Sequence, residues 1–378
     1  MTLVRDVRIG GLDGIRACAV IAVVWHHAHG GIESIPISLN GFLGVDVFFV
    51  LSGYLITTLL LREQATNGGI SLSKFYVRRS LRIFPLYFAV LAALTIYFWL
   101  KSHSSNQAAE YFLNLPYLLT YTSNLVELYD PMAISWSLSV EEQFYLLWPP
   151  LLVVVGWRRC MPILCILIGL NQAVNFGLLD AYLPYSKLPM LQATLTPILL
   201  GVMLGIVLAE TSTSRWAGLL AGWRLWIIVA LLLIVANTAG DIRGWPRLIF
   251  QVLTTIALAG VVLHPRHGIV QLLEWKPLVA IGAVSYGIYL LHMIVLYPVE
   301  RINKALGFAA PSITFLACLV LTFGAAWLSF RYFESPFLHL KNRFSSTSQQ
   351  TDHPQVMHDL RGGDSLERSK HVNPEGHP

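Results

Sequence analysis

Two basic side chains, Arg16 and His27, lie eleven residues apart in an apolar stretch near the N-terminus. Eleven helical steps of about 100° make three turns plus about 20°, so both would share one helix face, about 16 Å apart along the axis. His26 would point about 80° away from that face. If Arg16 lies at a membrane surface, His27 lies near the midplane, where a titratable group is costly and is a candidate for function. We expect His27 to handle a proton; a buried histidine satisfied by a neighbour is the alternative.

The second apolar segment adds a carboxylate and a hydroxyl that could act with this histidine. Asp46 opens that segment, and a carboxylate can orient a histidine in an acid–base site. Ser52 follows six residues later, next to Gly53. Two small neighbours also let helices approach closely, so a packing role is the alternative for Ser52.

A metal centre is not expected. The histidines at the end of the first segment have no carboxylate or cysteine at ligand spacing beside them, and these residues are His26, His27 and His29. The four cysteines lie in or beside apolar segments and form no C-x-x-C pair, which suggests apolar packing; they are Cys18, Cys160, Cys165 and Cys318.

Three arginines precede the third apolar segment, at positions 78, 79 and 82. A guanidinium group forms a planar fork that suits bidentate contacts with phosphate. Arg78 and Arg82 are four residues apart, so they would share a helix face. A phosphate site is therefore one interpretation, and a cytosolic anchor that follows the positive-inside rule is the other.

Two further polar groups lie at the start of later apolar segments. Glu141 and Glu142 either mark the water boundary or supply one carboxylate that orients or deprotonates a substrate hydroxyl. Ser285, Tyr289 and His292 follow the spacing i, i+4 and i+7, so they would form one polar helix face. A buried hydrogen-bond network between helices is the favoured role for that face.

The elements that must position these residues are membrane helices. Of the 378 residues, 55% are hydrophobic and 12% charged, against about 25% charged in soluble proteins, and the mean hydropathy is +0.60. We expect an all-α, polytopic transmembrane bundle of about ten spans. The expected spans are 15–31, 41–61, 84–100, 136–155, 162–179, 193–209, 223–238, 248–264, 279–298 and 312–330. The segment 111–126, broken by Asn114, Pro116 and Asn124, would be re-entrant or interfacial.

Charge predicts the orientation. With the N-terminus in the cytosol, most of the 26 Lys and Arg residues fall on the cytosolic side, so both termini should be cytosolic. The net charge of +5 then reflects orientation and not a nucleic-acid partner. From residue 344 the composition turns polar, so we expect one membrane domain over 1–343 and a disordered cytosolic tail over 344–378.

Six short motifs in order resemble the membrane-bound acyltransferase-3 family, whose best-known members O-acetylate surface polysaccharides. The second motif is one residue longer before its serine than the family shorthand. The motifs are Leu12–Arg16 with His27, Gly44–Gly53, Arg78–Pro85, Trp136–Tyr145, Ser285–His292 and Arg331–Phe337.

The resemblance implies an O-acyltransferase, most often an O-acetyltransferase, that moves an acyl group from cytosolic acyl-CoA to a hydroxyl of a carbohydrate or lipid-linked glycan. His27 would be the general base or acyl relay, assisted by Arg16, Asp46 and Glu142. The donor, acetyl-CoA, would be held by Arg16, Arg78, Arg79 and Arg82, with no permanently bound cofactor. The acceptor would meet Glu141, Glu142, Ser52, Tyr289 and His292.

The resemblance also implies a setting. The protein would be a multi-pass protein of the bacterial plasma (inner) membrane, in contact with lipid and without an appended soluble domain. The resemblance does not predict the number of subunits. The orientation predicted from charge, and not the resemblance, places the arginines at the cytosolic boundary and the two glutamates near the opposite one, with His27 between them. The alternative is a membrane transporter or exporter of an acylated or sugar solute with His27 as a proton relay, although no repeat of the transporter type is visible.

Overall fold

A computed structural model describes residues 10–28, 40–101, 106–128, 131–178, 189–210, 214–238, 244–307 and 310–344. His29 and residues 345–378 lie outside these ranges. The regular structure in the described ranges is helical throughout, which confirms the all-α prediction. The main helices are α1 (Leu12–Ala28), α2 (Leu43–Asn67), α3 (Leu72–Lys101), α4 (Asn106–Leu119), α5 (Ser135–Val155), α6 (Trp157–Asn175), α7 (Pro189–Glu210), α9 (Trp223–Ala236), α10 (Trp245–Leu263), α13 (Ser285–Ala305) and α14 (Pro311–Leu328). Shorter helices are α8 (Ser214–Leu219), α11 (Gly268–Leu273), α12 (Lys276–Ala283) and α15 (Ser335–Asn342).

Each of the ten predicted apolar segments falls on a helix, and the segment 279–298 is divided between α12 and α13. Within the described ranges, five helices are long and apolar enough to cross a membrane. A sixth span results if α12 and α13, which meet at 74°, are counted as one broken span. The chain is therefore an integral membrane protein by length and composition of its helices, while the number of ten spans and the orientation of the termini stay predictions.

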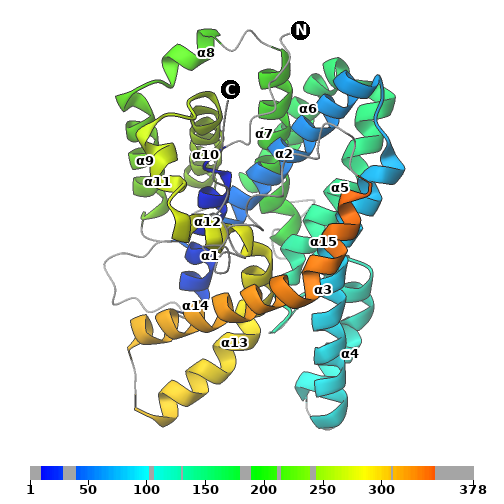
Figure 1. The fold of residues 1–378 in the computed structure, drawn as a ribbon, viewed down its shortest axis with the longest axis vertical. Helices are drawn as coiled ribbons and strands as arrows, with labels where there is room; N and C mark the ends of the chain where they lie inside the picture. The colour runs from blue at the N-terminus through cyan, green and yellow to red at the C-terminus, as the bar shows by residue number, and fades with distance from the viewer. Residues whose placement is uncertain are drawn as a thin grey trace, which may run out of the picture.

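Helix α1 lies in the middle of the bundle, in contact with α2, α12, α13 and α14 (Figure 1). Helices α13 and α14 form a hairpin on one side of the molecule, and α3 and α4 extend together on another (Figure 1). The most extensive contact between two helices is that of α2 with α7, which meet backbone to backbone. A Cβ atom at Gly53 would collide with the Ile198 carbonyl oxygen, and one at Gly201 with the Val50 carbonyl oxygen. Only glycine permits this approach, as is common between membrane helices.

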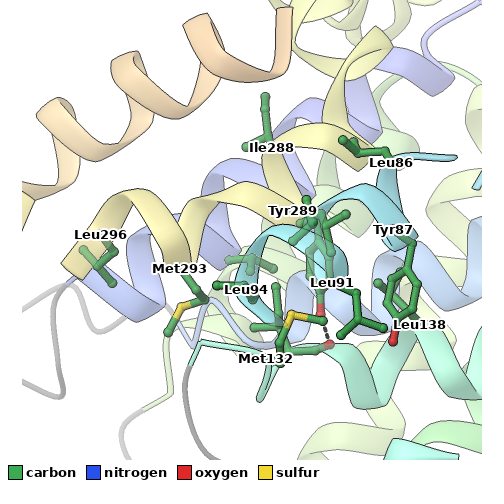
Figure 2. Packing of buried hydrophobic residues seen from close by; sticks show 14 of the residues in the cluster. Leu86, Tyr87, Leu91, Leu94, Met132, Leu138, Ile288, Tyr289, Met293 and Leu296 are labelled. Atoms are coloured by element: carbon green, nitrogen blue, oxygen red, sulfur yellow. Dashed lines mark hydrogen bonds between the residues drawn. The ribbon is translucent and has the colours of Figure 1, made fainter. Parts of the chain in front are cut away.

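The largest hydrophobic cluster joins α1, α3 and α13. Figure 2 shows Leu91 and Leu94 of α3 packed beside Tyr289 and Met293 of α13. Val23 of α1 belongs to the same cluster and is completely buried. Because these helices share one packed core, the polar residues that they carry are held in a fixed relation to one another.

The segment between α4 and α5 breaks the helical run. Asn124 lies in this break, whereas Asn114 and Pro116, which were also expected to interrupt the segment, lie inside α4. The break contains the one-turn 3₁₀ helix η1 (Ser123–Leu125) and Tyr121, whose φ of 52° is left-handed. Gln143 Nε2 of α5 donates to the Tyr121 carbonyl at 2.9 Å, and the Ser123 and Ser139 hydroxyls lie 2.7 Å apart. Irregular backbone is tolerated at membrane depth where protein groups satisfy it, and the polar face of α5 does so here.

Candidate active site

Two histidines from distant parts of the chain meet in the bundle. His27 lies in the last turn of α1 and His292 in the second turn of α13. His292 Nε2 lies 3.3 Å from His27 Nδ1, and the ring centroids are 4.9 Å apart. His292 is completely buried and His27 is half-buried. A titratable pair at this depth is the arrangement expected of a functional site in a membrane protein.

The neighbouring histidine points elsewhere, as the helical register predicts. The His26 side chain is exposed, and its ring centroid lies 5.6 Å from that of Phe42. The ring centroids of His26 and His27 are 5.3 Å apart. Of these two rings, His27 is the one that contacts His292 among the described residues. The expectation that the two histidines face different neighbours is confirmed.

Arginines from α1 and α3 gather at the other end of α1. Arg16 donates to Asp13 at 2.7 Å, one turn earlier on the same helix. Arg82 lies within electrostatic reach of Arg16 and Arg79. The Arg79 guanidinium carbon lies 4.5 Å from the centroid of the Tyr145 ring of α5. Three guanidinium groups in one low-dielectric region repel one another, and Asp13, which is paired with Arg16 and also acts on Arg82, offsets part of their charge.

Two carboxylates of α5 lie beside these arginines. Ser52 Oγ of α2 donates to Glu141 Oε1 at 2.7 Å, and Tyr145 OH donates to Ser52 Oγ at 3.1 Å. Glu141 and Glu142 both interact electrostatically with Arg79. Glu142 Oε1 is buried without a hydrogen-bond partner among the described residues. The site therefore holds one carboxylate oxygen that a ligand O–H or N–H group could satisfy.

This geometry corrects the predicted sidedness. The arginines and the glutamates were expected at opposite boundaries of the membrane, with His27 between them, yet Arg79 interacts with both glutamates. The reason lies at the start of α5, where Ser135 and Ser139 are completely buried. Helix α5 thus begins inside the protein, after the break that contains η1, and its second turn carries Glu141 and Glu142 to Arg79.

Two predicted site residues are occupied by partners outside this cluster. Asp46 is completely buried and accepts both Arg247 Nε and Nη2 at 2.9 Å, with Gln251 Nε2 at 3.1 Å. Arg78 donates to Glu63 Oε2 at 3.0 Å and to the Phe344 carbonyl at 3.0 Å. These are charge-compensating contacts between helices. Asp46 is thus held by Arg247, whereas an orienting role toward His27 was expected.

Tyr289 of the polar face on α13 connects this helix to α5. Its hydroxyl lies 2.6 Å from Ser137 Oγ and donates to the Ile134 carbonyl at 3.2 Å. The Tyr289 carbonyl, in turn, lies at hydrogen-bond distance from His292 Nδ1. The predicted interhelical network on this face is therefore present, and its role in binding an acceptor stays a prediction.

The structure adds three residues to those singled out from the sequence. Tyr145 lies between Ser52 and Arg79. Tyr286 donates to the Ile83 carbonyl of α3 at 2.8 Å. Glu334, in the π-helix Ser329–Glu334, lies within electrostatic reach of Arg82. Each belongs to one of the six motifs, so motif membership was the available signal, and π-helical turns are frequent at functional sites.

All six motifs thus contribute side chains to one connected region of the bundle. No group of three His, Cys, Asp or Glu side chains suited to a metal ion is found in the part of the chain that the structure describes. A sequence model of the acyltransferase domain matches residues 9–331. The chain belongs to the acyltransferase-3 family.

Several bacterial proteins are similar in sequence to most of this chain. The peptidoglycan O-acetyltransferase OatA of Listeria monocytogenes is 30% identical over 360 residues, which cover 87% of this chain and 55% of the relative. The O-acetyltransferase OatA of Staphylococcus aureus is 30% identical over 356 residues, covering 86% and 56%. The chain thus spans about half the length of the curated relatives that it matches. No solved structure matches the chain.

Proposed function

We propose that this family member is an integral membrane O-acetyltransferase that moves an acetyl group from acetyl-CoA to a hydroxyl of a bacterial cell-surface glycan. The observation that carries the proposal is the arrangement along α1, where an arginine cluster lies at one end and the contact of His27 with His292 lies at the other. The glycan class follows from the relatives, of which one is named a peptidoglycan O-acetyltransferase. Peptidoglycan sugars are therefore the first acceptors to test.

The arginine cluster supports coenzyme A as the source of the acyl group. Coenzyme A carries several phosphate charges, and Arg16, Arg79 and Arg82 would pair with them through charge-assisted hydrogen bonds. The helical rise places His27 about 16 Å along α1 from Arg16. A donor whose thioester lies at the end of an extended pantetheine arm, far from its phosphates, suits this separation. Arg78 is not needed for this role, because it is already paired with Glu63.

The histidine pair supports general-base chemistry at the thioester. His27 would take the proton from the acceptor hydroxyl while the hydroxyl oxygen forms a bond to the acetyl carbonyl carbon. The carbon–sulfur bond then breaks, and coenzyme A leaves as a thiolate that receives the proton from His27. A positioned general base typically accelerates such a step about 10²–10⁴-fold. Glu142, with its unsatisfied oxygen, would accept a hydrogen bond from substrate.

The experiment is acetyl transfer by the full chain purified in detergent or reconstituted in lipid. Acetyl-CoA with an isotopically labelled acetyl group is offered with peptidoglycan fragments, and mass spectrometry detects the labelled ester. The wild-type protein should acetylate a sugar hydroxyl, and His27→Ala should lose transfer while it still inserts. The matched control is His26→Ala, which changes the adjacent, exposed ring. Folded wild-type protein that transfers no acetyl group to any cell-surface glycan fraction would refute the proposal.

A further inference from the structure

We propose that His292 is a positioning residue that acts with the Val23 carbonyl to hold His27 in one tautomer, with the proton on Nδ1 and the proton-accepting lone pair on Nε2. This inference rests on the proposed function, because it names the atom of His27 that receives the proton from the acceptor hydroxyl. The two residues are 265 positions apart, and their contact exists only in the folded bundle.

The geometry of His292 determines which of its nitrogens can accept. Its Nδ1 lies 2.5 Å from the Tyr289 carbonyl oxygen, one turn earlier on α13. A carbonyl oxygen only accepts hydrogen bonds, so Nδ1 must carry the proton. In a neutral imidazole the other nitrogen is then an acceptor. His292 therefore presents a lone pair at Nε2, the atom that lies 3.3 Å from His27 Nδ1.

The geometry of His27 leads independently to the complementary assignment. His27 Nδ1 lies 2.9 Å from the Val23 carbonyl oxygen, one turn earlier on α1. That contact also requires a proton on Nδ1, for the same reason. The Nδ1–H group is thus shared between the Val23 carbonyl and His292 Nε2. In the neutral ring, the lone pair must then be on Nε2, on the far side of the imidazole from His292.

A neutral orienting residue suits this location. A carboxylate often holds a catalytic histidine in the required tautomer, but a carboxylate at membrane depth needs a compensating cation. Asp46, the carboxylate that the sequence suggested for this role, has that cation in Arg247 and is held by it. His292 supplies an acceptor without adding a charge. Its backbone is held in turn, since Cys318 Sγ of α14 donates to the His292 carbonyl at 3.7 Å.

The first test compares two substitutions of His292. Leucine removes the acceptor, whereas the glutamine side-chain oxygen can reach the position of Nε2 and accept from His27 Nδ1–H. We expect His292→Leu to lower kcat at least tenfold and to leave the KM for acetyl-CoA unchanged. The loss should not exceed the whole contribution of a general base, which is about 10²–10⁴-fold. His292→Gln should recover a clear part of kcat. A purely structural role would not distinguish the two variants at equal amounts of folded protein.

The matched control is Asn303→Leu, also on α13. Asn303 is buried and donates to Thr314 Oγ1 of α14 at 2.9 Å, so its loss removes a buried side-chain contact of the same helix, here between α13 and α14. It lies eleven residues beyond His292, about 16 Å along the helix axis. The kcat of Asn303→Leu should stay close to that of the wild type. A loss in Asn303→Leu as large as that in His292→Leu would overturn the positioning role.

The second test needs no activity. Nitrogen-15 NMR of histidine-labelled protein in lipid distinguishes protonated from unprotonated ring nitrogens, and the His27 signals are those that disappear in His27→Ala. We expect a protonated Nδ1 and an unprotonated Nε2 in the wild type. In His292→Leu the Val23 carbonyl still accepts from Nδ1–H but the second acceptor is lost, so we expect the share of the other tautomer to rise. A protonated Nε2 in neutral wild-type His27 refutes the inference even if transfer occurs. Conversely, the expected spectrum in protein that transfers nothing would support the tautomer and refute the proposed function.

Discussion

Replacing Asp46 by leucine separates a structural role of this carboxylate from a catalytic one. Asp46 is completely buried in α2, and both of its oxygens are engaged by Arg247 and Gln251 of α10. At 2.9 Å and an effective dielectric constant of about 20, the attraction between the two charges is about 6 kcal/mol. The desolvation of both ions offsets part of this, so removing one partner should cost about 3–5 kcal/mol of the free energy of unfolding.

This cost is large enough to measure in detergent. A loss of about 3–5 kcal/mol corresponds to a fall in Tm of roughly 4–6 °C for a chain of this size. The double variant Asp46→Leu with Arg247→Leu removes both charges, so it should recover most of the lost stability. The assay is thermal unfolding of the purified protein, followed by acetyl transfer measured per amount of folded protein. Transfer by folded Asp46→Leu should stay near the wild-type value.

The opposite pattern would refute this reasoning. If Asp46→Leu keeps its Tm and loses transfer, Asp46 takes part in the chemistry, as its position in the second motif first suggested. A double variant whose loss of stability equals or exceeds the sum of the losses in the two single variants would also contradict a stabilising ion pair between α2 and α10.

Three further predictions follow from the site. His27→Ala should lower transfer about 10²–10⁴-fold, whereas His26→Ala should be mild; the reverse order in labelled-acetyl assays would show that the other ring faces the chemistry. Arg82→Ala should raise the KM for acetyl-CoA more than the KM for the acceptor. Arg78→Ala, which removes a buried ion pair, should instead lower Tm by several degrees and leave the KM for acetyl-CoA unchanged in the folded fraction. Equal effects of the two variants on this KM would count against the division, and the Kd is measured separately because KM reports binding only when chemistry is slow. A chain that ends after Phe344 should keep its transfer rate, because the polar residues beyond it have no apolar face with which to dock; a large loss in protein that still inserts would show that the tail takes part.

Local periodicity was enough to predict several features. The apolar segments became helices because their composition and length leave little alternative in a membrane. The face shared by Arg16 and His27, and the different direction of His26, follow from the 3.6-residue repeat alone. The polar face at the start of α13 was predicted in the same way, and its Tyr289 makes the expected contact with another helix.

Contacts between distant helices could not be predicted from that repeat. The sequence suggested Asp46 as the partner of a histidine because both lie near the N-terminus, but folding brings it Arg247, 201 residues away. Glu141 was placed at the opposite boundary because its helix was assumed to start at water. The broken segment before α5 lets that helix begin inside the protein instead, which brings Glu141 to Ser52 and Arg79.

The sequence by itself therefore determined the helical, membrane-embedded class, the family motifs and the face on which each motif residue lies. Only the tertiary structure decided which faces meet, because helix packing depends on side-chain shape and close backbone approach at sites such as Gly53 and Gly201. The contact of His27 with His292 is the clearest case. Each histidine was visible in its own segment, but their 3.3 Å separation depends on α1 and α13 sharing one packed core.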